Sequence, residues 1–139
     1  MLKLLLALSV GALFVSPVQA TDLYPATKAC VPGKPHCERW TAEFKRSLAL
    51  AQKGDHVAQQ TVAFCLYSGC HGAVAIDRVA SCSWYLVIAD SGAATVLDRS
   101  NLRNSCQPMT PAQKDEARAL SGELVRKLYN RAPVAGDQI

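Results

Sequence analysis

Six cysteines and three histidines are the residues of this sequence whose types could carry chemistry. They are Cys30, Cys37, Cys65, Cys70, Cys82 and Cys106, with His36, His56 and His71. Thiols and imidazoles bind zinc, attach haem c or exchange disulfides, and each role has a typical spacing. The segment from Cys65 to His71 could belong to a zinc site completed by Cys82, or to a haem attachment. Haem and dithiol motifs have two residues between their cysteines, and zinc ligands come in two close pairs. The cysteine spacing of this chain therefore disfavours a zinc site, a haem attachment and a dithiol redox motif. We therefore expect no metal and no cofactor, and interpret the histidines as solvated residues near loops.

The first twenty residues predict export. Lys3 is followed by an apolar run over residues 4–15 and by small residues at Val18 and Ala20. This is the layout of a signal peptide cleaved after Ala20. The run is too short to span a bilayer, so we expect no stable membrane anchor after cleavage and a periplasmic or secreted location. A retained anchor or an ordinary core helix is the alternative interpretation.

An even number of cysteines in an exported chain is typical of a disulfide framework. Six cysteines allow fifteen pairings. We favour the set that pairs Cys82 with Cys106. These two cysteines are expected on antiparallel segments, at similar distances along the chain from the bend near Gly92. The favoured set is Cys30–Cys37, Cys65–Cys70 and Cys82–Cys106, and the alternative set contains Cys65–Cys82 and Cys70–Cys106.

Apolar residues recur at helical spacing along most of the chain. The expected helices run from about Trp40 to Gly54, and over about 56–67, 77–92, 96–103 and 110–130. Asp77 and Thr110 are suitable N-caps, and Thr110 is followed by Pro111 at the first helical position and by Gln113 at the capping-box position. No alternating strand pattern or hairpin dipeptide occurs, so the expected class is all-α.

The chain is expected to form one small domain. The expected organisation is a signal peptide over 1–20, an extended N-terminal arm over 21–37, a helical domain over 38–131 and a flexible tail over 132–139. The net charge is +4 at pH 7, with no run of basic residues. A positive charge this small does not predict a nucleic-acid partner.

The stretch from Ala58 to Gly92 resembles a Sel-1-like repeat, the α/α solenoid relative of tetratricopeptide repeats. The matching positions are Tyr67, Gly72, Asp77, Trp84, Tyr85 and Gly92. The spacing from Asp77 to Gly92 agrees fully with the repeat pattern, whereas Phe64 and Cys70 stand where the family has glycines. The segments over 46–54 and 92–129 resemble degenerate repeats on either side.

The resemblance implies a fold and a function. The fold would be a short α/α solenoid of antiparallel helix pairs, in which Trp84 packs between two helices and disulfides replace missing repeats. Members of this family mostly act as adaptors, and exported bacterial ones include regulators and immunity proteins. We therefore expect a non-catalytic module that binds another protein, with contacts on the concave face around Tyr67, His71 and Tyr85.

Two enzymatic alternatives stay open. Some cysteine-rich relatives of the family are linked to β-lactam binding or hydrolysis, but this chain has no Ser-x-x-Lys motif. Ser81 and Ser83 have no recognisable base near them in the sequence, and the paired carboxylates Asp115 and Glu116 belong to the polar face of a helix. The second alternative is a thiol or haem redox protein.

Overall fold

The structure is a computed structural model that describes residues 27–134 and 139. The expected signal peptide and residues 135–138 of the expected tail lie outside the described residues. The elements are α1 (Pro35–Ala51), α2 (His56–Ser68), the 3-10 turn η1 (Cys70–Gly72), α3 (Arg78–Asp90), α4 (Val96–Cys106) and α5 (Pro111–Tyr129). These residues contain no strand, only an isolated antiparallel bridge between Thr27 and Val74. The all-α class expected from the sequence is confirmed.

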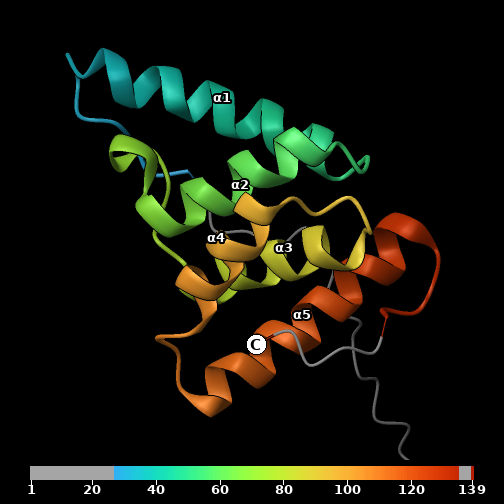
Figure 1. Ribbon diagram of the computed structural model, residues 1–139. Helices are drawn as coiled ribbons and strands as arrows, with labels where there is room; N and C mark the ends of the chain where they lie inside the picture. Colours follow the sequence, from blue (N-terminus) through green and yellow to red (C-terminus); the bar gives the residue numbers. More distant parts are fainter. Residues whose placement is uncertain (1–26, 135–138) are drawn as a thin grey trace, which may run out of the picture.

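Helix α3 forms the centre of the fold. It packs against α2, α4 and α5, while α1 packs on the far side of α2. In Figure 1, α1 and α2 lie on one side of α3, α5 lies on the other, and α4 crosses in front. Every residue over 80–88 is buried, as is typical of a helix surrounded by other helices rather than exposed along one side. Helices α4 and α5 each make their main contacts with α3 rather than with each other.

The two buried serines of α3 are satisfied by hydrogen bonds. Ser81 Oγ donates to the carbonyl oxygen of Ala63 at 2.9 Å and lies 2.9 Å from Ser105 Oγ, and Ser83 Oγ donates to the Val79 carbonyl at 2.7 Å. A buried hydroxyl without a partner would cost about 1–3 kcal/mol. These bonds therefore allow a serine-containing helix to occupy the core.

Capping side chains set the starts of α2, α3, α4 and α5, whereas α1 has no side-chain cap. Asp77 accepts a hydrogen bond from the backbone N–H of Ala80 at 2.9 Å, and Asp55 accepts one from Ala58 at 2.8 Å. Thr110 and Gln113 form the capping box expected from the sequence. An N-cap of this kind contributes about 1 kcal/mol by satisfying an end amide that has no partner within the helix.

Two helix ends differ from the prediction. Helix α1 begins at Pro35, inside the segment expected as an extended arm, because proline is suited to the first helical position. Helix α4 continues past Arg103 to Cys106. Gly72 and Gly92, two glycines of the expected repeat pattern, have φ values of +84° and +80°. Both values require the left-handed region that glycine adopts most easily.

The three disulfides are those of the favoured set. They join Cys30 to Cys37, Cys65 to Cys70, and Cys82 to Cys106. The third links α3 to α4, whereas the first two close short segments near the start of α1 and the end of α2. Three disulfides indicate a non-reducing environment of the kind found outside the cytoplasm. Across the described residues, we find no helix with the length and apolar character needed to cross a membrane.

The disulfide between α3 and α4 should contribute more stability than the one at the α2 turn. The sequence separations are 24 and 5 residues, so the chain-entropy estimate is about 3.5 kcal/mol for the first and about 2 kcal/mol for the second. All four cysteines are buried, so the two double alanine variants lose similar packing. Urea unfolding of Cys82→Ala/Cys106→Ala should show the larger loss, and an equal or smaller loss would contradict this ranking.

Candidate functional site

Tyr85, an expected contact residue, belongs to the core. Its exposed fraction is 5%. Burial, together with the charge of Asp98 and the proximity of Tyr67, raises the pKa of Tyr85 to about 12. The phenol therefore stays protonated and offers no surface to a partner. The expectation of a direct contact is wrong for this residue, because α3 is covered on all sides rather than along one face.

Tyr67 lies at the end of α2 and is half-buried. The guanidinium carbon of Arg78 is 3.8 Å from the centre of its ring. Such a cation–π contact contributes about 0.5–1 kcal/mol at an exposed site. Tyr67 therefore anchors the start of α3 to the end of α2, and Arg78 covers one face of its ring.

His71 is exposed on η1 and faces α1 rather than the two tyrosines. Its ring centre lies 5.8 Å from that of His36 and 6.1 Å from the Trp40 ring, with which it is stacked. An open pocket of about 470 Å³ adjoins this cluster and is lined by Lys34, His36, His71 and the Cys30–Cys37 bridge, among others. The structure thus does not bring Tyr67, His71 and Tyr85 together on one contact surface.

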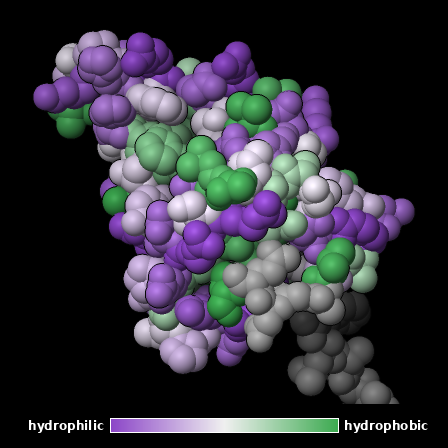
Figure 2. Space-filling model, in the orientation of Figure 1, coloured by the Kyte–Doolittle hydropathy of each residue, from purple (hydrophilic) through white to green (hydrophobic). Residues whose placement is uncertain are grey.

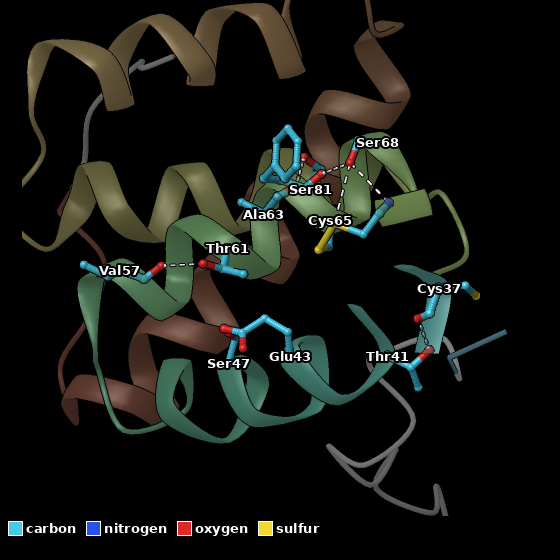
Figure 3. The surroundings of a disulfide bond; sticks show 12 residues. Cys37, Thr41, Glu43, Ser47, Val57, Thr61, Ala63, Cys65, Ser68 and Ser81 are labelled. Atoms are coloured by element: carbon cyan, nitrogen blue, oxygen red, sulfur yellow. Dashed lines mark hydrogen bonds between the residues drawn. A yellow bond between two sulfur atoms is a disulfide. The ribbon is translucent and has the colours of Figure 1, made fainter. Parts of the chain in front are cut away.

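A different part of α2 presents apolar surface to solvent. The helix contains no Asp, Glu, Lys or Arg. Val57 and Phe64 have exposed fractions of 68% and 49%. Thr61 stands between them in the sequence and Ser68 one turn after Phe64, so the four residues follow helical spacing. Thr61 Oγ1 donates to the Val57 carbonyl at 3.0 Å and Ser68 Oγ to the Phe64 carbonyl at 2.9 Å, as Figure 3 shows for Thr61 and Ser68. Because both hydroxyls donate hydrogen bonds to carbonyl oxygens of α2, this side of the helix is less polar than its sequence implies.

The start of α4 extends the apolar surface. Val96 and Leu97 have exposed fractions of 79% and 64%, and their neighbour Asp98 contacts His56 and Gln60 at the start of α2. Figure 2 shows apolar side chains gathered where α2 and α4 meet. We call this surface the α2–α4 face, and it comprises Val57, Thr61, Phe64, Ser68, Val96 and Leu97.

A buried carboxylate joins the two helices behind the α2–α4 face. Asp98, with an exposed fraction of 2%, accepts hydrogen bonds from Gln60 Nε2 at 2.6 Å and from the amide and hydroxyl of Thr95 at 2.8 and 2.7 Å. The Nε2 atom of His56 lies 3.2 Å from its Oδ2 atom. Burial alone would raise the pKa of Asp98, but the hydrogen bonds from Gln60 and Thr95 and the nearby His56 outweigh it and lower the pKa. Asp98 is therefore a structural anion that holds the starts of α2 and α4 together.

The contacts among His56, Gln60 and Asp98 are not predicted from the sequence. His56 is expected in solvent, whereas the structure places it against Asp98. The Thr95-x-x-Asp98 spacing marks a helix start, and His56 and Gln60 share one face of α2. Both signals are local, and neither shows that the two helices meet.

Comparisons of the chain with protein-family models, curated proteins and solved structures gave no match. The Sel-1-like resemblance therefore stays a prediction.

Replacing Asp98 with asparagine should destabilise the protein by about 1–3 kcal/mol at pH 7, because the new amide group would face donors at Thr95 and Gln60. The stability that comes from the lowered pKa is present above about pH 4 and is lost as the pH falls below it. The difference between wild type and Asp98→Asn in urea unfolding should therefore shrink from pH 7 to pH 3.

Asp115→Asn is the matched control, since Asp115 is exposed on α5 and its ion pair with Arg118, one turn away, lies at the surface. It should change stability by less than about 0.5 kcal/mol. If Asp98→Asn lost the same free energy of unfolding relative to wild type at pH 7 and at pH 3, the assigned role of the carboxylate would be contradicted.

Proposed function

We propose that this chain is a periplasmic or secreted, non-catalytic module of the Sel-1-like repeat type that binds another protein through its α2–α4 face. The observation that carries the proposal is the exposed apolar surface on a helix without Asp, Glu, Lys or Arg. Isolated exposed apolar residues are ordinary on protein surfaces, whereas a contiguous group marks an interaction site. An immunity or regulatory adaptor is the narrower form of the proposal, and it rests on the family resemblance.

The arrangement of the helices supports this proposal. Helices α2 and α3 pack together as successive helices, with α1 before them and α4 after them. In an α/α solenoid, stacked helix pairs form a concave binding surface. Helices α2 and α4 begin successive helix pairs in the expected repeat pattern, and both carry exposed apolar residues.

The side chains that the enzymatic alternatives would need are engaged in the structure. Both serines weighed as nucleophiles, Ser81 and Ser83, are fully buried and donate hydrogen bonds to carbonyl oxygens. All six cysteines form disulfides. These features favour a binding role over β-lactam hydrolysis or thiol exchange.

Phe64→Glu tests the binding face. A charge in the centre of an apolar interface should weaken binding by at least about 2 kcal/mol, or about 30-fold, because a carboxylate would be buried without a partner. The protein is immobilised and exposed to envelope extract, and the proteins it retains are identified and measured by quantitative mass spectrometry. We expect at least one protein that wild type enriches and Phe64→Glu does not.

Leu50→Glu is the control, because Leu50 is an exposed apolar residue on α1 outside the face. This variant should retain the same partner as wild type. Equal loss in both variants, or no protein whose capture depends on Phe64, would contradict the proposal. Hydrolysis of nitrocefin by the purified wild type would favour the enzymatic alternative.

A further inference from the structure

Two imidazoles from distant parts of the chain meet beside α1. His36 lies in the first turn of α1 and His71 on η1, and their ring centres are 5.8 Å apart. Both side chains are exposed. The α2–α4 face contains neither residue, so the pair is independent of the proposed binding function.

Disulfides restrain the backbone next to both histidines. The Cys30–Cys37 bridge adjoins His36, and the Cys65–Cys70 bridge adjoins His71. The arm is also tied to the turn, because the backbone N–H of Lys28 donates to the Ala73 carbonyl at 2.9 Å. The two rings are therefore presented by restrained segments rather than by free loops.

The backbone at His71 is unusual for a residue with a side chain. Its φ is +58°, and Cys70 before it has a φ of +40°. A residue other than glycine in this region is uncommon and costs free energy that the surrounding structure must offset. Here this conformation places the His71 imidazole beside Trp40 and His36.

The distance between the rings suits one metal ion held between them. A metal–imidazole bond is about 2.0–2.1 Å long, and the ring centre lies roughly 1 Å beyond the nitrogen, so two rings on one ion have centres about 5–6.5 Å apart. On His36, Nδ1 lies 3.4 Å from the Arg39 guanidinium, which leaves Nε2 for a ligand. We propose that His36 and His71 together bind one divalent transition-metal ion.

The chemistry favours Cu²⁺ among such ions. Imidazole binds the divalent metals of this series with an affinity that peaks at copper. Across the described residues, no three His, Cys, Asp or Glu side chains gather around a possible metal position, so water would complete the coordination of the bound ion. Lys34 lines the same pocket, and its positive charge opposes the ion.

Calorimetric titration of the full oxidised protein with CuCl₂ at pH 7.5 tests this site. The variants are His36→Gln and His71→Asn, the second chosen because asparagine tolerates a positive φ. Two linked ligands bind about 100-fold or more tightly than one, so each variant should weaken Cu²⁺ binding by about that factor. Trp40 fluorescence should be quenched in wild type at the same Cu²⁺ concentration, and Trp40→Phe should lose most of the quenching while it still binds the ion.

His56→Gln is the matched control, because His56 is the remaining histidine and lies against Asp98 instead. Its affinity for Cu²⁺ should stay within about twofold of the wild-type value. Circular dichroism of each variant reports whether it folds. Lys34→Gln adds a second test, since removal of the positive charge should tighten the binding of a cation.

Three results would overturn the proposal. One is Cu²⁺ binding of equal strength in wild type and a folded His36→Gln/His71→Asn double variant. Another is an equal loss in His56→Gln. The third is an absence of Cu²⁺ binding together with binding of inorganic phosphate that weakens in Lys34→Gln, because the pocket would then be an anion site.

Discussion

The complete burial of α3 is the constraint on which the rest of this structure depends. Nine consecutive residues, 80–88, are enclosed by three other helices, and Trp84 at their centre has no exposed surface. A Trp side chain buries 150–250 Å², so removal of α2, α4 or α5 would expose apolar surface that is now buried. The stability of the fold therefore depends on the contacts that hold α2, α4 and α5 against α3.

The other stabilising features act at the edges of this arrangement. The Cys82–Cys106 bridge fixes α4 to α3, and the carboxylate of Asp98 fixes the start of α4 to α2. A stack of many repeats would supply such neighbours by repetition. Among the five α-helices of residues 27–134, covalent and ionic links take that role, and the outer surfaces of α2 and α4 stay exposed, as the proposed binding face requires.

Much of this fold could be predicted from local sequence. The helices can be recognised from apolar spacing and from caps such as Asp77 and Thr110, and the Cys82–Cys106 pair can be predicted from the expected positions of these two residues along antiparallel segments. Burial of Tyr85 could not be predicted in this way, because helical period shows which residues share a face but not how many faces are covered. The contacts of His56 with Asp98 and of His36 with His71 join residues 42 and 35 positions apart, so they depend on tertiary packing.

The most direct test of the central role of α3 is hydrogen–deuterium exchange of the oxidised protein, followed by mass spectrometry. Amides over 80–88 should exchange most slowly, with a free energy of opening equal to that of global unfolding measured in urea. Helix α1 packs mainly against α2 rather than against α3. Its amides should therefore exchange earlier. If residues 80–88 exchanged as fast as those of α1, the account of α3 as the centre of stability would be contradicted.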